Sequence, residues 1–262
     1  MTNDDVPASE VASIPGRWSL PSWLSDDALP TFTVRDTRSA QGRLDRRNKT
    51  ITVADLVLAH GHACDGLLRG VWAMRALADF AFADDGFDRS DLLVVSKNSP
   101  CLGDVAAYLT GGRTRFGTHR LDDRLGVGFQ LQRLSTPEAW EVREEPGFFP
   151  ANIIAWEAEL LRAGRDESEM RELLAIHEAA QWDWVREVLL PSAPSDHYTT
   201  RRLDRLELPA ALLEARRTDT VNRLVPAPRS VISPDDPDLD NEPRDPADQI
   251  RWRRRYDAGP AA

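Results

Sequence analysis

Side chains that bind metals or act as nucleophiles gather in one short stretch of the chain. His60, His62 and Cys64 place two of the five histidines and one of the two cysteines within five positions. Imidazole nitrogen and thiolate sulfur are the donors that zinc and other borderline-soft cations prefer. The stretch therefore predicts a metal site.

Local geometry favours the convergence of these side chains on one ion. Residues two apart in an extended segment point to the same side, so His60, His62 and Cys64 are expected to face one ion. Gly61 removes a side chain from between the histidines and tolerates unusual backbone angles. Cys64 directly precedes a predicted helix, whose dipole favours the thiolate form. A thiolate there is a nucleophile even without a metal.

The second cysteine stands in a similar context. Cys101 ends a turn that follows a predicted strand, and a predicted helix starts directly after it. If the two turns face each other, two thiolates and two neutral imidazoles neutralise a divalent cation. Asp104, one helical turn later, then has three possible roles: ligand, partner of a histidine, or general base. Taken alone, a cysteine at a helix start is more often an inert buried side chain than a functional one, so Cys101 by itself predicts no site.

Other polar side chains near these turns are candidates for handling a substrate. Arg113, Arg115 and His119 lie in a basic turn, and guanidinium groups form paired hydrogen bonds with anions. A solvated hairpin that balances an acidic surface explains the same residues equally well. Lys97 and Asp104 are the candidate catalytic proton carriers.

The elements that position these side chains follow from the hydrophobic pattern. Apolar residues recur with the helical period over 65–82, and runs at 91–96 and 127–132 predict strands. Two helices are predicted over 151–190 with a break at Gly164, and a third helix follows. The predicted organisation is an N-terminal arm (1–30), an α+β domain (31–137), a helical extension (138–225) and a proline- and aspartate-rich tail (226–262) that is disordered or wraps around the body.

Composition argues against several classes of protein. The chain has 262 residues and a formal net charge of −10, which disfavours binding to nucleic acid or to an anionic membrane. No apolar run reaches the roughly 18 residues of a membrane-spanning helix, and the start of the chain does not resemble a signal peptide. Two cysteines are too few for a disulfide framework. A cytoplasmic protein with reduced thiols is expected.

Two segments resemble, in order and spacing, motifs of the FmdE family, which takes its name from formylmethanofuran dehydrogenase. The residues from His60 to Leu67 read HGHACDGL and are similar to the family's HGHxCPGL. Those from Lys97 to Asp104 read KNSPCLGD and are similar to its ENDxCxxD. The resemblance implies an α+β fold with a β-sheet flanked by helices, a homodimer, and a metal site at the first motif.

The sequence thus predicts a metal-dependent enzyme that acts on a small molecule. The predicted ligands are His60, His62, Cys64 and Cys101, and zinc is the metal that this donor set suits best. One alternative is a non-catalytic metal-binding accessory protein or metallochaperone. Another is a protein that binds haem or a different transition metal through the same cluster, although a c-type haem attachment is excluded because the chain has no Cys-x-x-Cys-His.

Overall fold

A computed structural model describes residues 20, 23–24, 28–37, 46–162, 164 and 166–206. Most of the predicted N-terminal arm, the predicted helix near 209–217 and the predicted tail lie outside these residues. Of the helices in the described part, none has the length and apolar character needed to cross a membrane.

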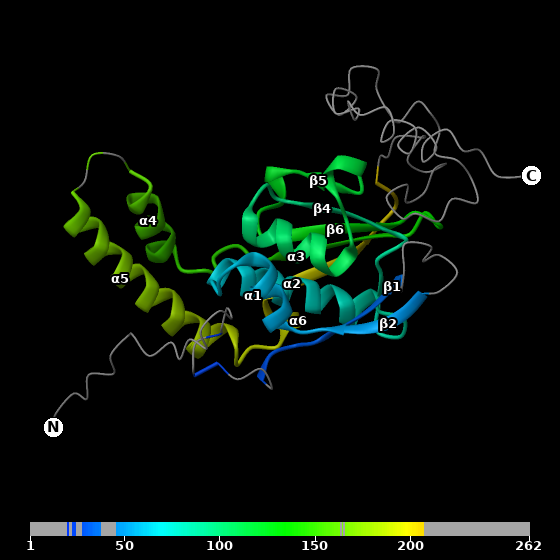
Figure 1. Ribbon diagram of the computed structural model, residues 1–262, viewed down its shortest axis with the longest axis horizontal. Helices are drawn as coiled ribbons and strands as arrows, with labels where there is room; N and C mark the ends of the chain where they lie inside the picture. Colours follow the sequence, from blue (N-terminus) through cyan, green and yellow to red (C-terminus); the bar gives the residue numbers. More distant parts are fainter. Residues whose placement is uncertain are drawn as a thin grey trace, which may run out of the picture.

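The described strands form two sheets (Figure 1). The smaller sheet has the order β2-β1-β3, and the larger has the order β5-β4-β6-β7-β8. Strands β4 and β5 are parallel, and the other pairs of the larger sheet are antiparallel. The strand bounds are β1 Phe32–Thr37, β2 Arg46–Ile51, β3 Phe87–Asp88, β4 Leu92–Ser96, β5 His119–Leu121, β6 Gly128–Arg133, β7 Ala139–Glu144 and β8 Tyr198–Leu203.

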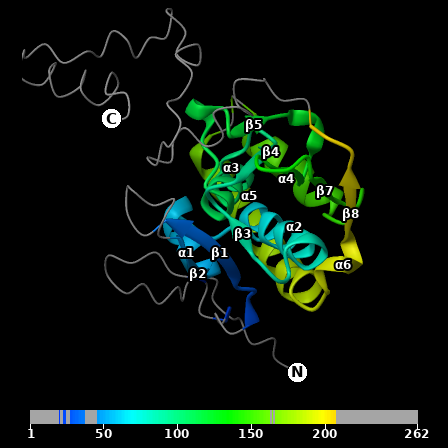
Figure 2. The same cartoon turned by 90° about the vertical axis from the view of Figure 1, so that its right-hand side faces the viewer.

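Three helices carry the motif residues, and two of them pack against the larger sheet. They are α1 (Val53–His60), α2 (Asp65–Ala81) and α3 (Pro100–Thr110). Helix α2 is the central one, and Figure 2 shows it between the two sheets. Its buried side chains share one apolar core with Phe32 of β1 and Phe129 of β6. The predicted α+β fold with a helix-flanked sheet is confirmed.

The burial of strand β4 explains the unbroken apolar run at 92–95. Leu92 and Val94 enter the main core, whereas Leu93 and Val95 enter a second cluster on the opposite face of the sheet. A strand covered on both faces loses the alternation of polar and apolar residues.

A helical hairpin follows the first seven strands and projects from the body of the molecule (Figure 1). It consists of α4 (Ala151–Leu160) and α5 (Glu167–Trp184), and Gly164 lies between them with φ +95°. The predicted break at Gly164 is confirmed. A π-helical turn (η5, Val185–Leu189) and the short helix α6 (Pro194–His197) then lead into β8.

The larger sheet extends past the boundary that the sequence predicts at residue 137. Strand β7 pairs with β6, and β8 returns after the hairpin to pair with β7. The hairpin is thus an insertion between two neighbouring strands of one sheet. The pattern of β8, YTTRRL, contains little apolar character, and its pairing partner is more than fifty residues away, so local periodicity does not indicate it.

Glu141 of β7 gives the sheet a pH-dependent contribution to stability. Its carboxylate accepts hydrogen bonds from Gln130 (2.6 Å), Arg201 (2.8 Å) and Arg143 (3.1 Å). Burial by itself raises the pKa of Glu141, but these bonds outweigh burial and lower the pKa to about 2 from the ordinary 4.5.

We therefore expect Glu141→Gln to lower the free energy of unfolding at neutral pH. A carboxyl whose pKa is lower in the folded state stabilises the fold above its unfolded pKa, and this stabilisation is lost as the pH falls through the folded pKa. Urea unfolding should show the difference between wild type and variant shrinking between pH 4.5 and about 2. A difference that stays constant over that range would contradict this role.

Candidate metal centre

Helix α1 places His60 at its last position. Its first turn is fixed by a capping box: the Thr52 hydroxyl accepts a hydrogen bond from the Asp55 amide (3.2 Å), and the Asp55 carboxylate accepts one from the Thr52 amide (2.9 Å). Gly61 ends the helix at φ +103°, a conformation that favours glycine, and its amide donates to the Val57 carbonyl. The segment at His60 is therefore helical. The prediction that this segment is extended, with residues two apart facing the same side, is wrong.

Helix α2 begins directly after Cys64, the second candidate donor. Cys64 is its N-cap, and its sulfur accepts a hydrogen bond from the Leu67 amide at 3.3 Å. Cys64 therefore follows the end of α1 by a three-residue turn, and the two helix ends bring His60 and Cys64 together. The structure confirms that Cys64 starts a helix, as the sequence predicts.

Cys101 lies in the first turn of helix α3. Pro100 occupies its first turn, and Cys101 follows directly. A close approach of α2 and α3 depends on glycine, because a Cβ atom at Gly66 would lie 3.1 Å from the Cys101 sulfur and one at Gly70 would lie 3.0 Å from Leu102.

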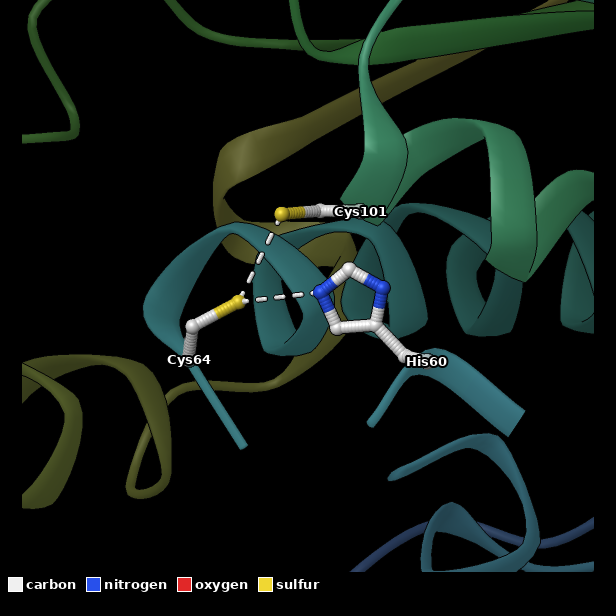
Figure 3. A group of neighbouring side chains, drawn as sticks. All are labelled: His60, Cys64 and Cys101. Carbon is white, nitrogen blue, oxygen red and sulfur yellow. Dashed lines mark hydrogen bonds between the residues drawn. The ribbon is translucent and has the colours of Figure 1, made fainter. Parts of the chain in front are cut away.

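One nitrogen and two sulfurs lie close together where α1 ends and where α2 and α3 begin (Figure 3). The Cys64 sulfur lies 3.5 Å from the Cys101 sulfur and 3.9 Å from Nε2 of His60. The donor atoms all lie within 4.8 Å of one another. The His60 side chain is 3% exposed, and both cysteines are partly exposed. This is a compact Cys₂His donor set.

The two thiols differ in their readiness to ionise. A hydrogen bond from Cys64 lowers the pKa of Cys101 to about 6 against the opposing effect of burial, and His60 adds to the lowering. The same thiol–thiol hydrogen bond, together with burial, raises the pKa of Cys64. The pair therefore carries one negative charge readily, and a second proton is expected to leave when a cation enters.

Asp104 orients the imidazole of His60. Its Oδ2 lies 2.8 Å from Nδ1 of His60, while Nε2 of the same ring faces the sulfurs. The carboxylate itself is half-exposed. Of the three roles that the sequence left open for Asp104, the geometry matches that of a histidine partner.

We expect Asp104→Ala to weaken zinc binding by about 10–100-fold, the usual cost of losing such a partner. Asp104→Asn retains a hydrogen-bond acceptor and should lose less. Competition with a chromophoric chelator measures the affinity. Asp84→Ala is the control, because Asp84 is an exposed acid beyond the far end of α2. Equal metal affinity in Asp104→Ala and Asp84→Ala would contradict the role of Asp104 as the partner of His60.

His62 lies beside the donor set without joining it. Its side chain is exposed, and its ring centroid is 4.5 Å from that of His60. Among the described residues, the group of donors that lie close together comprises His60, Cys64 and Cys101. The predicted role of His62 as a ligand therefore stays a prediction.

The other predicted residues take different positions around the centre. Lys97 is exposed in the turn between β4 and α3, and Arg113 is exposed at the start of the 3-10 helix η3 (Thr114–Phe116), which contains Arg115. The side chain of Arg115 lies outside the described part. His119 is buried in β5, where its Nε2 bonds to the Ser96 hydroxyl at 2.8 Å. Burial lowers the pKa of His119, and the nearby Asp104 carboxylate opposes this effect.

A largely buried ion pair lies next to Cys64, and the sequence gives little indication of it. Arg69 forms two hydrogen bonds to Glu144 of β7, one of 2.9 Å, and also pairs with Asp65 at 3.4 Å. Its guanidinium lies over the ring of Phe149, and the Tyr198 hydroxyl donates to Glu144. The four-residue spacing of Asp65 and Arg69 is the one sequence signal for it. The pair ties the first turn of α2, next to Cys64, to the sheet.

Comparisons with known proteins agree with the motifs. A family model described as FmdE, molybdenum formylmethanofuran dehydrogenase operon, matches residues 59–189, which is half of the chain. No curated protein matches. A solved structure of a tungsten formylmethanofuran dehydrogenase FmdE-like protein from Syntrophus aciditrophicus is 18% identical, with coverage of 64% of this chain and 79% of that chain and a TM-score of 0.38. By its match to the family model, the chain belongs to the FmdE family.

Proposed function

We propose that the protein is a metal-dependent enzyme that acts on a small molecule, with zinc as the metal. One observation carries the proposal: the donor atoms of His60, Cys64 and Cys101 lie within 4.8 Å of one another at the ends of three helices. Three protein donors that include two sulfurs fit a zinc site with one position left for a substrate, whereas structural zinc sites use four.

The charge of the donor groups and the space around the Cys101 sulfur are compatible with a bound divalent cation. Two thiolates and a neutral imidazole neutralise its charge, and the glycine at position 66 leaves room for the Cys101 sulfur. When bound, the ion supplies Lewis-acid chemistry that polarises a substrate group at the open position.

The chain's own residues then have distinct tasks. Asp104 accepts the proton at Nδ1 of His60 in a hydrogen bond and so keeps Nε2 available to the ion. Lys97 and Asp104 are the proposed proton carriers. Arg113 and Arg115 are the proposed contacts for an anionic substrate.

Cobalt substitution tests the open position. Cobalt(II) replaces zinc in such sites and has visible absorption that reports the number of ligands. The cobalt protein should change its spectrum in a saturable manner when azide is added, because azide fills the open position. A spectrum that azide leaves unchanged would indicate a closed site and contradict the enzyme proposal.

A non-catalytic metal carrier is the second candidate, and the partial exposure of Cys64 and Cys101 favours it. A carrier must release its ion to a partner. Zinc should then pass to a competing chelator within seconds, faster than it leaves a buried enzyme site. Retention for hours would count against a carrier.

We also propose that the protein is a homodimer paired through the α4–α5 hairpin. The hairpin exposes four large apolar side chains, those of Ile154, Leu161, Leu174 and Ile176, and Leu161 is 83% exposed. Monomeric proteins seldom expose such groups in numbers on one element.

We expect light scattering to give twice the chain mass of 29.3 kDa for wild type and the single mass for Leu161→Asp/Ile176→Asp. The control is Leu58→Asp, because Leu58 is 53% exposed but lies on α1, outside the hairpin. A single mass for wild type, or a double mass for the hairpin variant, would refute the proposal.

A further inference from the structure

We propose that Cys64 and Cys101 form a reversible intramolecular disulfide when the site holds no metal, and that this bond and the ion exclude each other. The two sulfurs lie 3.5 Å apart although the residues are 37 positions apart in the sequence. The exclusion rests on the proposed function, whereas formation of the bond does not.

The geometry requires only a small movement. A disulfide bond is about 2.05 Å long, so the sulfurs must approach each other by about 1.5 Å. Both cysteines stand at helix starts, and Cys64 follows the short turn that begins at Gly61. Each side chain can therefore shift without disturbing the interior of a helix.

The fold keeps the path between the sulfurs clear. The Cys101 sulfur lies against the backbone of Gly66, where an added Cβ would stand 3.1 Å away. Figure 3 shows the two sulfurs facing each other with no labelled side chain between them. Both cysteines are partly exposed, so a small oxidant can reach them.

The proposed oxidant is a small-molecule disulfide such as oxidised glutathione. One cysteine sulfur attacks a sulfur of the oxidant, forms a mixed disulfide and releases one small thiol. The second cysteine attacks the protein sulfur of that mixed disulfide, which forms the Cys64–Cys101 bond and releases the second small thiol. Two electrons pass to the oxidant, and the two protons of the cysteines leave with the released thiols.

The bond and the ion compete because they use the same sulfurs. A metal ligand must be a thiolate, and a disulfide sulfur carries no such charge. Oxidation therefore releases the ion, and a bound ion protects the thiols from exchange. A small thiol reverses the reaction and restores the donor set.

The test treats chelator-stripped full-length protein with oxidised glutathione and compares it with zinc-loaded protein. We expect the stripped protein to lose both free thiols, to lose the mass of two hydrogens, and to yield one peptide pair linked through Cys64 and Cys101. The zinc-loaded protein should keep both thiols. The oxidised protein should bind no zinc until a thiol reductant is added.

Single-cysteine variants make the result interpretable. Cys64→Ser and Cys101→Ser should each retain one glutathione as a mixed disulfide, because the resolving thiol is missing. Two glutathione adducts on stripped wild type, or two thiols that stay free, would overturn the proposal. Formation of the internal bond in a wild type that binds no zinc under any condition would support the disulfide and refute the metal site.

Discussion

Replacing Arg69 with methionine lowers the free energy of unfolding by about 3–5 kcal/mol. The side chains of Arg69 and Glu144 are only 13% and 9% exposed, and Arg69 also pairs with Asp65, whose side chain is 15% exposed. Methionine keeps an apolar side chain beside the ring of Phe149 but removes the guanidinium that pairs with the two carboxylates. An uncompensated buried charge costs far more than the lost ion pair contributes. Denaturant unfolding at neutral pH measures the change.

Two further variants separate this effect from a general loss of a charged side chain. Arg75→Met removes an arginine from the same helix whose partner, Asp79, is 58% exposed, and should cost at most about 1 kcal/mol. Arg69→Met/Glu144→Gln keeps an acceptor for the Tyr198 hydroxyl and should recover more than half of the loss. Similar stabilities for Arg69→Met and Arg75→Met would contradict the role of the buried pair.

We expect the loss of either sulfur to reduce the affinity for the proposed zinc ion by at least about 100-fold, since the loss of even an outer partner of a ligand costs about 10–100-fold. Cys64→Ser is the more informative variant. Its hydroxyl can still accept from the Leu67 amide and cap α2, so the helix start is kept while the thiolate is lost. Cys101→Ser should lose affinity to a similar extent. Chelator competition measures the affinity, and circular dichroism verifies the fold.

Ser99→Ala is the matched control for the cysteine variants. Ser99 precedes α3 two positions before Cys101 and makes no capping hydrogen bond with its side chain. Its replacement should leave the affinity unchanged. A loss in Ser99→Ala equal to that in Cys101→Ser would show that the start of α3, and not the thiolate, determines binding.

The composition of the centre was largely predictable, whereas its geometry was not. The types and spacing of His60, Cys64 and Cys101 indicated a shared site, and the structure brings all three together. The expectation of an extended segment was wrong because α1 runs to His60. A helix of eight residues is marginal by itself and forms here with the Thr52 cap and the packing of Leu56 and Val57 in the core.

Long-range pairing accounts for most of what the sequence did not indicate. Strand β8 joins the sheet after the α4–α5 hairpin, and Glu144 of β7 meets Arg69 of α2 across 75 positions of chain. Hydrophobic periodicity predicts neither contact, because the partners are polar residues or a mostly polar strand within their own segments. The buried strand β4 and long helix α2, whose patterns are local, were correctly predicted.

An X-ray absorption spectrum of the zinc-loaded protein at the zinc edge determines whether the proposed Cys₂His donor set holds the ion. The Cys₂His centre predicts one zinc per chain with two sulfur neighbours at about 2.3 Å and at least one nitrogen neighbour at about 2.0 Å. Cys64→Ser should show one sulfur fewer. Zinc neighbours that are only nitrogen and oxygen, or a full-length protein that retains no zinc after dialysis, would show that these cysteines do not bind the metal.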